Sequence, residues 1–272
     1  RSLRDADSSP VATVMGSHLM FHPDTAAMMR AIGLLKPSGR CCTWDARADG
    51  IVFGEASLAL TLSSSSTPHH HTTIGNVTVR QDGRTAVMTA PNGRAQQLLY
   101  QDSLRSMGIE DWNLSICALH GTGTSLGDPV EASSLSAVMA ENTSTITGIK
   151  ANTGHTGAAG GVVALLILSL NLLHGKAHPH AQLRRMNGAV RDVLSRKMVA
   201  SVPVVASQIA FELPSRTAGG VSSFGWSGTI VHGVLFHPLQ KVELTKNCFM
   251  FRRRAFCFGP ARSRMFIERN VT

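Results

Sequence analysis

Two histidines each follow a predicted strand, at the point where the strand ends. His120 comes directly after the apolar residues 114–119, and His155 follows residues 145–149 and precedes an apolar helix. The positive end of that helix dipole disfavours a charged imidazole, so we expect a neutral ring at His155. Two neutral imidazoles at neighbouring strand ends can each donate a hydrogen bond to a developing oxyanion or enolate. We therefore expect both rings to face one cavity, with their nitrogens on the order of 5 to 8 Å apart.

Two further features accompany these histidines. Lys150 lies shortly before His155, where its ammonium can orient polar groups or hold charge in the same site. His120 opens a Gly-Thr-Gly-Thr turn at residues 121–124, whose glycines let backbone or a ligand approach closely. The turn lacks the Lys-Ser/Thr ending of a phosphate-binding loop, and its glycine spacing does not fit a dinucleotide fingerprint. A single histidine is more often a buried structural residue than a catalyst. The hypothesis of a catalytic site therefore depends on His120, His155 and Lys150 occurring together.

Alternating strands and helices must position these side chains. The helices that we predict run from an Asn92 cap to about 107, from an Asp128 cap through Pro129 and Glu131 to about 141, and from 158 to 174, where Gly175 ends the helix. Residues 176–218 look irregular. The predicted strands are residues 11–16 (buried), 51–62, 74–79, 114–119, 145–149, 221–224 and 230–236, the last two joined by a glycine-rich turn. This alternation indicates a layered α/β fold.

Composition limits the class of protein. The 272 residues are 43% apolar and 16% charged, which is typical of a globular chain with a large core and not of a disordered one. The longest apolar stretch, residues 157–173, is rich in Gly and Ala and contains Ser169 and Asn171, which favours a buried helix over a membrane span. The five cysteines form no paired pattern, and a reducing location, the cytoplasm or a plastid, is expected.

The positive charge gathers at one end of the chain. Residues 246–272 hold seven of the 26 Lys and Arg residues and one acid, so they carry +6 of the net +9. No zinc-finger spacing or RNA-binding motif accompanies them, so we expect no nucleic-acid partner. Four phenylalanines within ten residues predict instead that this tail packs on the domain. Residues 63–73 are polar and of low complexity, which predicts an exposed loop, and the three histidines at 69–71 are assigned no metal.

Five motifs, in family order, resemble those of β-ketoacyl synthases, especially the ketosynthase domains of modular polyketide synthases. Residues 120–132 (HGTGTSLGDPVEA) resemble the first histidine motif, and residues 150–156 (KANTGHT) resemble the Lys-x-Asn-x-Gly-His segment. The other three are residues 45–55 (DARADGIVFGE), residues 81–85 with 89–93 (QDGRT and TAPNG), and residues 221–229 (VSSFGWSGT).

The resemblance implies a thiolase-like fold with αβαβα layers, and decarboxylative Claisen condensation of an acyl thioester with malonyl-carrier protein. It assigns decarboxylation and oxyanion stabilisation to His120 and His155, and ordering of the site to Lys150. By the same resemblance, no cofactor is bound directly. The substrates would come on the phosphopantetheine arm of an acyl carrier protein, and the complete protein would be a homodimer. Four residues are assigned to substrate binding: Thr122 and Thr124 on that arm, Phe224, and Trp226 at the position of a gatekeeping aromatic.

The sequence departs from the family at the nucleophile. The family's cysteine lies in a Thr-Ala-Cys-Ser-Ser elbow, which is absent. We therefore interpret all five cysteines as buried or incidental thiols: Cys41, Cys42, Cys117, and Cys248 and Cys257 of the tail. We therefore expect an N-terminally truncated ketosynthase that cannot form an acyl-enzyme alone. Its predicted parts are an incomplete N-terminal half (1–73), a complete C-terminal half (74–238) and a basic aromatic tail (239–272). A non-catalytic thiolase-like module that binds or dimerises is the alternative. A thiolase proper is a third, although it would need a late Cys-x-Gly turn where Val221 to Gly225 stand.

Overall fold

The computed structural model describes residues 11–36, 39–63, 72–85, 90–107, 114–139, 144–196, 204–205, 211–213 and 218–237. All of them belong to one unit that spans Arg1–Gln240. The predicted loop at 63–73 lies almost wholly outside these residues, and the tail at 246–272 lies entirely outside them.

A six-stranded mixed sheet forms the centre of the described part, with the strand order β3-β10-β9-β4-β5-β7. Strands β3, β10 and β9 pair antiparallel, whereas β9, β4, β5 and β7 run parallel. Their bounds are β3 (Thr73–Gln81), β4 (Ile116–Ala118), β5 (Thr145–Thr147), β7 (Val204–Val205), β9 (Ala218–Phe224) and β10 (Thr229–Phe236). The antiparallel β9–β10 hairpin and strand β3 confirm the predictions for those segments.

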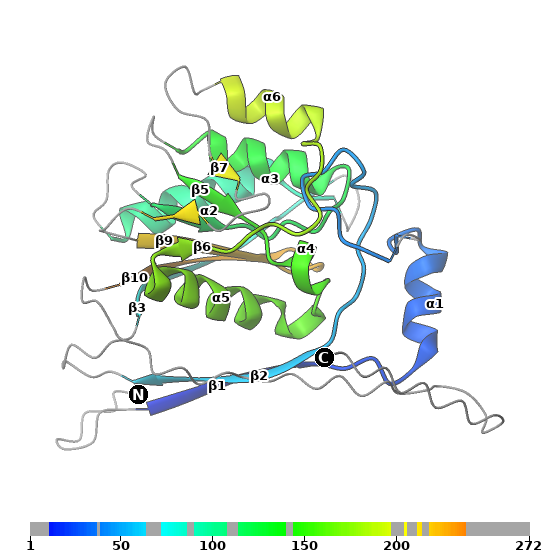
Figure 1. The fold of residues 1–272 in the computed structure, drawn as a ribbon, viewed down its shortest axis with the longest axis horizontal. Coiled ribbons are helices and arrows are strands. Elements are labelled where there is room, and N and C mark those ends of the chain that lie inside the picture. The colour runs from blue at the N-terminus through cyan, green and yellow to red at the C-terminus, as the bar shows by residue number, and fades with distance from the viewer. Residues whose placement is uncertain are drawn as a thin grey trace, which may run out of the picture. The chain divides into compact units, whose positions relative to one another are not determined.

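Helices cover both faces of this sheet (Figure 1). The helices α2 (Gly93–Arg105), α3 (Gly127–Ser136) and α6 (Gly188–Arg196) lie on one side, and α5 (Gly160–His174) lies on the other. Below α5 lies a two-stranded antiparallel sheet of β1 (Val11–His18) and β2 (Ala56–Ser63). The described layers are therefore helix, sheet, helix, sheet, in agreement with the layered α/β prediction. The remaining elements are α1 (Pro23–Ala31), α4 (Lys150–Thr153), the 3-10 turn η1 (Gly157–Ala159), β6 (Lys176–Ala177) and β8 (Phe211–Glu212).

Strand β4 shows how the sheet divides the core. Cys117 packs with Tyr100 and Leu135 on the side of α2 and α3, whereas Ile116 packs with Leu168 on the side of α5. Successive residues of a strand point to opposite faces, so a continuous apolar run can fill both cores.

The helical segment Gly157–His174, which comprises η1 and α5, is long and apolar enough to cross a membrane by length and composition alone. In the structure it contacts β9 on one side and β1 and β2 on the other. These contacts favour the predicted interior helix. Gly175 ends the helix in the left-handed conformation, at φ 62°, as expected for a C-cap glycine.

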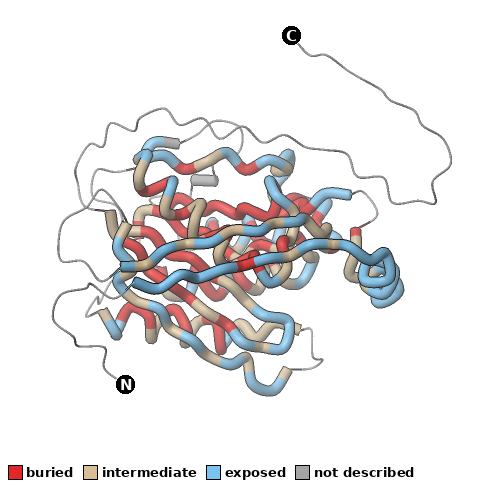
Figure 2. The backbone as a smooth tube through the Cα atoms, turned by 90° about the horizontal axis from the view of Figure 1, so that it is seen from below, coloured by how far each residue is buried: buried red, intermediate tan, exposed pale blue. Residues whose placement is uncertain are grey.

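Several predicted boundaries and burial assignments are wrong. Helix α3 begins at Gly127 and ends at Ser136, and the Asp128 side chain caps no amide of its own helix. Residues 176–218 are not irregular throughout, because they include α6. Strand β1 is largely exposed instead of buried: in Figure 2 the hairpin is mostly pale blue and tan, and Met15 is 77% exposed. Among the described residues, the elements that pack most against β1 are β2, η1 and α5.

Candidate active site

Three adjacent parallel strands end at one edge of the central sheet, and each brings a site residue there. Phe224 ends β9, His120 follows β4, and Lys150 follows β5. Polar groups at the carboxyl ends of parallel strands can converge because the strands point the same way. His155 lies beside them, because its ring contacts the His120 ring. Its backbone forms an isolated parallel bridge with Phe53.

The His120 and His155 rings lie in edge-to-face contact, with their centroids 5.8 Å apart and their planes at 86°. The two rings are therefore in contact, whereas the predicted distance between their nitrogens and their shared cavity stay predictions. The Phe224 ring packs 5.3 Å from His120, and the Phe53 ring packs 6.1 Å from His155. Sequence reasoning assigned no role to Phe53, although it lies inside one of the family motifs.

Backbone amides fix the tautomer of both imidazoles. The amide of Phe224 donates to Nδ1 of His120 at 3.2 Å, and the amide of Gly157 donates to Nδ1 of His155 at 3.0 Å. An amide can only donate, so each Nδ1 must accept, and a neutral ring then carries its proton on Nε2. Both histidines can therefore present an Nε2–H donor.

The surroundings keep both rings neutral. Burial, followed by the charge of Lys150, lowers the pKa of His120 well below its ordinary value. Burial, then Lys150 and His18, lowers the pKa of His155 to about 3. The neutral state of His155 agrees with the prediction, and burial is the first of its causes. The Gly157 amide, at the start of the following helical segment, also favours the neutral ring, because its hydrogen bond occupies Nδ1.

Lys150 is 3% exposed, and its ammonium donates to both the carbonyl and Nδ1 of His120, the latter at 3.3 Å. Burial lowers its pKa to about 8, against the raising effects of Glu131, Cys41 and Asp128. The structure thus brings Lys150 into direct contact with one of the two histidines.

The predicted substrate-binding residues lie around the same strand ends. Thr122 and Thr124 share a hydrogen bond of 3.2 Å, and the Thr124 hydroxyl also accepts from the amide of Gly127. Trp226 lies in the turn of the β9–β10 hairpin and is 43% exposed. Their contacts with substrate remain predictions.

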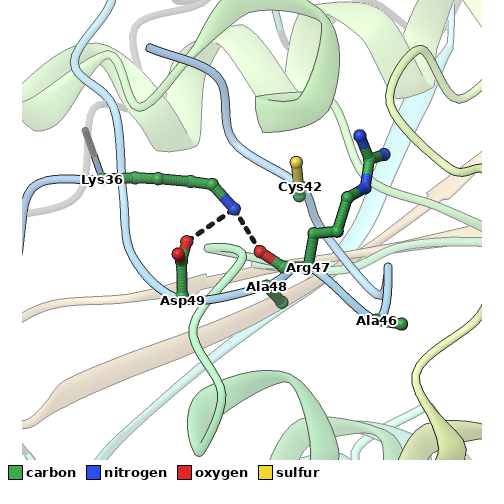
Figure 3. A pocket seen from close by; sticks show the side chains of 6 residues that line it. All are labelled: Lys36, Cys42, Ala46, Arg47, Ala48 and Asp49. Atoms are coloured by element: carbon green, nitrogen blue, oxygen red, sulfur yellow. Dashed lines mark hydrogen bonds and ion pairs between the residues drawn. The ribbon is translucent and has the colours of Figure 1, made fainter. Parts of the chain in front are cut away.

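The three cysteines of the described part, Cys41, Cys42 and Cys117, are buried thiols. Cys248 and Cys257 lie outside the described residues. Cys117 lies inside β4, and Cys41 both accepts from the amide and donates to the carbonyl of Val52. Burial raises the pKa of Cys41, which favours the unreactive thiol. Cys42 lines a cavity of about 410 Å³, beside which Lys36 is ion-paired with Asp49 at 2.5 Å (Figure 3). None of the predicted site residues lines this cavity.

Two acids were missed as site residues because the sequence pattern also fits a helix start. Asp128 and Glu131 are 0% and 3% exposed. The Asp128 carboxylate accepts hydrogen bonds from the amides of Gly123 and Trp44, and the Glu131 carboxylate accepts them from the amides of His120 and Gly121. His18 was missed as well. Its ring lies against Gly157, where a Cβ atom would come within 2.3 Å of Nδ1.

The family comparison covers most of the described chain. Residues 1–67 match the β-ketoacyl synthase N-terminal domain, and residues 71–184 match the β-ketoacyl synthase C-terminal domain. Among curated proteins, the phthioceranic/hydroxyphthioceranic acid synthase of Mycobacterium tuberculosis is 32% identical over 241 residues, and the compactin diketide synthase mlcB of Penicillium citrinum is 32% identical over 240. Each alignment covers 86% of this chain, but only 11% and 9% of those two proteins.

A solved structure agrees with these matches. The ketosynthase from module 6 of the bacillaene synthase of Bacillus subtilis superimposes with a TM-score of 0.76 at 30% identity, covering 84% of this chain and 42% of that one. This similarity confirms the thiolase-like fold. The chain belongs to the β-ketoacyl synthase family, with the sequence and fold of a ketosynthase domain from a modular polyketide synthase.

Proposed function

We propose that His120, His155 and Lys150 serve decarboxylative Claisen condensation between an acyl thioester and malonyl-carrier protein in polyketide or fatty-acid synthesis. The observation that carries this proposal is the matched pair of imidazoles. Both are neutral, both accept at Nδ1 from a backbone amide, and their ring centroids are 5.8 Å apart. Two adjacent rings that each carry an Nε2–H donor suit a thioester oxygen that gains negative charge.

In the proposed reaction, the bond between the malonyl carboxylate and its α-carbon breaks. Carbon dioxide leaves, and the electron pair moves into an enolate whose oxygen accepts hydrogen bonds from the two histidines. The α-carbon then attacks the acyl thioester, a carbon–carbon bond forms, and the thiolate that held the acyl group departs. Lys150 holds His120 in place throughout, through its hydrogen bonds to the ring and the carbonyl.

The acyl-bearing cysteine is not one of the three described thiols in this proposal, because all three are buried in the protein core. We propose that the substrates arrive on phosphopantetheine arms of acyl carrier proteins, with Thr122, Thr124, Phe224 and Trp226 beside the arm. Dimerisation of the complete protein and a reducing location, cytoplasmic or plastid, belong to the same proposal.

Release of labelled carbon dioxide tests the reaction. Malonyl-carrier protein labelled in the free carboxyl group is incubated with the 272-residue chain and with the His120→Ala and His155→Ala variants. We expect release by the parent chain and a loss of about 10²-fold or more in each variant, as for removal of an oxyanion donor. The Arg94→Ala variant, changed at an exposed residue of α2, serves as the control and should retain the parent rate.

A labelled acyl thioester tests the nucleophile. We expect no label on Cys41, Cys42 or Cys117 that can be transferred to malonyl-carrier protein, since these thiols are buried. Transfer from any of them would contradict the assignment.

A non-catalytic binding module remains the second candidate, and one observation favours it. Large apolar side chains are exposed on β1, on α1 and beside them, among them Val11, Met15, Phe21, Met28 and Ile32. Exposed apolar patches commonly mark interaction surfaces. Absence of carbon dioxide release by a chain that folds and self-associates in sedimentation experiments would favour this candidate over the enzyme.

A further inference from the structure

His18, the last residue of β1, contacts both of the groups that touch the His155 ring. Its own ring packs on the Phe53 ring, with the centroids 5.4 Å apart, and Phe53 in turn packs on His155. On its other contact it lies against Gly157, where a Cβ atom would come within 2.3 to 2.7 Å of the Nδ1, Cε1 and Cγ atoms of His18. The His18 ring therefore fills the space that a side chain at position 157 would need.

The backbone of β1 fixes the place of this ring. His18 is opposite Ala56 in the pairing of β1 with β2, and just after it the amide of Met20 donates to Glu55 at 2.6 Å. Gly16 is buried, and a Cβ atom there would lie 3.1 Å from the Cα atom of Ala159 in η1. Residues 16 and 18 face the same side of a strand. The strand can thus approach η1 closely because both Gly16 and Gly157 lack a side chain.

Packing, and not hydrogen bonding, accounts for the position of the His18 ring. Its Nε2 is buried and has no hydrogen-bond partner among the described residues. A buried polar atom without a partner lowers the free energy of unfolding, whereas an apolar group of the same shape avoids that cost. A phenylalanine at this position should therefore fold and keep the contacts with Gly157 and Phe53.

The position of Gly157 matters for the ring of His155. The Gly157 amide donates to Nδ1 of His155 at 3.0 Å, which leaves the proton of the neutral ring on Nε2. The backbone of His155 is held separately, since its amide donates to the Val52 carbonyl and its carbonyl accepts from the amide of Gly54. If the Gly157 amide moved away, Nδ1 could carry the proton, and Nε2 would become an acceptor. The residue would stay in place, but its donor would be lost.

We propose that His18 is a positioning residue of this site, whose ring, packed on Gly157 and Phe53, keeps the Gly157 amide on Nδ1 of His155 and thereby keeps the donor on Nε2. This inference rests on the proposed function, because it concerns the donor that His155 offers to a substrate oxygen. It predicts a change in the tautomer of one histidine, which can be observed without any substrate.

Nuclear magnetic resonance on the 272-residue chain, labelled with ¹⁵N, tests the proposal. In the parent we expect His155 to be the Nε2–H tautomer. In His18→Ala, signals of the Nδ1–H tautomer of His155 should appear. Hydrogen exchange at the Gly157 amide should become about 2- to 10-fold faster, which corresponds to the net strength of one hydrogen bond. His18→Phe should retain the parent tautomer and exchange rate, because the ring is kept.

Two controls separate this effect from a general loss of stability. Ser17→Ala changes the exposed neighbour on the same strand and should alter neither readout. The Leu119 amide, which donates to the Thr147 carbonyl within the sheet, should exchange at the same rate in His18→Ala as in the parent.

A double variant tests the contact itself. Gly157→Ala places a Cβ atom against the His18 ring, and His18→Ala removes that ring. The urea midpoint of the double variant should therefore fall by less than the sum of the two single losses, as for residues in direct contact. Additive losses would contradict the proposal.

An unchanged His155 tautomer and an unchanged Gly157 exchange rate in a folded His18→Ala variant would overturn the proposal. If that variant does not fold, His18→Leu decides by the same two readouts, because leucine has no flat ring to lie on Gly157. A change of tautomer in His18→Phe would also overturn it, since packing would then not be the cause. These readouts remain measurable if no carbon dioxide is released, so failure of the proposed function and failure of this inference are distinguishable.

Discussion

Replacing Gly123, in the turn that follows His120, by alanine should lower the free energy of unfolding for two reasons. One is its left-handed backbone conformation, and the other is its close contact with neighbouring backbone atoms. Gly123 has φ +77°, and a Cβ atom there would lie 3.1 Å from the Cys42 nitrogen and 3.3 Å from the Thr43 nitrogen. Gly83 has nearly the same conformation, φ +72°, but no atom within 4 Å of the added Cβ. Gly123→Ala and Gly83→Ala should therefore cause similar backbone strain, but only Gly123→Ala brings a Cβ atom close to the Cys42 and Thr43 nitrogens.

The magnitudes follow from this comparison. The left-handed conformation costs an alanine about 1–2 kcal/mol, and the restricted unfolded chain returns about 0.4–1 kcal/mol. Gly83→Ala should therefore reduce the free energy of unfolding by about 1 kcal/mol. Gly123→Ala adds overpacking of about 1–3 kcal/mol against backbone atoms that cannot rotate away, which gives a total of about 2–4 kcal/mol.

Urea denaturation provides the measurement. Trp44 is buried beside this turn, so its fluorescence reports on unfolding there. We expect a lower midpoint for Gly123→Ala than for Gly83→Ala, with similar slopes for both variants. Equal losses in the two variants would refute the reasoning, because they would show that the close approach of the turn to Cys42 costs nothing.

Three further substitutions follow from burial and charge. His180 is stacked on Trp44 and is 1% exposed, and burial lowers its pKa to about 4, so the unfolded chain takes up the proton first as the pH falls. The parent should therefore lose about 2 kcal/mol of its free energy of unfolding between pH 7.5 and pH 5, and His180→Phe should not show this loss in urea titrations. An equal change in free energy of unfolding for the two proteins over this pH range would contradict the prediction. Leu168→Ala, in the core beside α5, should lower the free energy of unfolding by about 2–5 kcal/mol. Arg80→Ala, which breaks a partly exposed pair with Asp102, should cost at most about 1 kcal/mol, and less in 1 M salt.

Elements with strong local signals could be predicted from the sequence. The Asn92 side chain accepts from the amide of Ala95, as its cap position implies, and the glycine-rich turn joins β9 and β10 in a hairpin. Helix α6 was missed although a signal existed. Asn187 accepts from the amide of Ala189, and Val190 and Leu194, one helical turn apart, are both buried.

Burial was harder to predict than element type. The apolar residues of β1 suggested a covered strand, yet Val11 and Met15 are exposed, because burial depends on what packs against the strand. The burial of Cys117 was predicted correctly. It is buried because its strand, β4, is paired with β9 on one side and with β5 on the other. A strand's composition indicates that it can be buried, and only its neighbours determine whether it is.

The candidate site shows the same division between local and long-range information. The sequence predicted that His120, His155 and Lys150 lie together, because each of them follows the end of a predicted strand. Strand ends and glycine turns can be recognised from the local sequence alone. The hydrogen-bond partners of Asp128 and Glu131 could not be predicted from the local sequence. An acid at a helix start indicates that amides are near, but here the Thr124 hydroxyl accepts from the amide of Gly127, and Pro129 has no amide hydrogen to donate. The Asp128 carboxylate therefore accepts from the amides of Gly123 and Trp44, and the Glu131 carboxylate from those of His120 and Gly121, so both acids stabilise the backbone of the site and not their own helix.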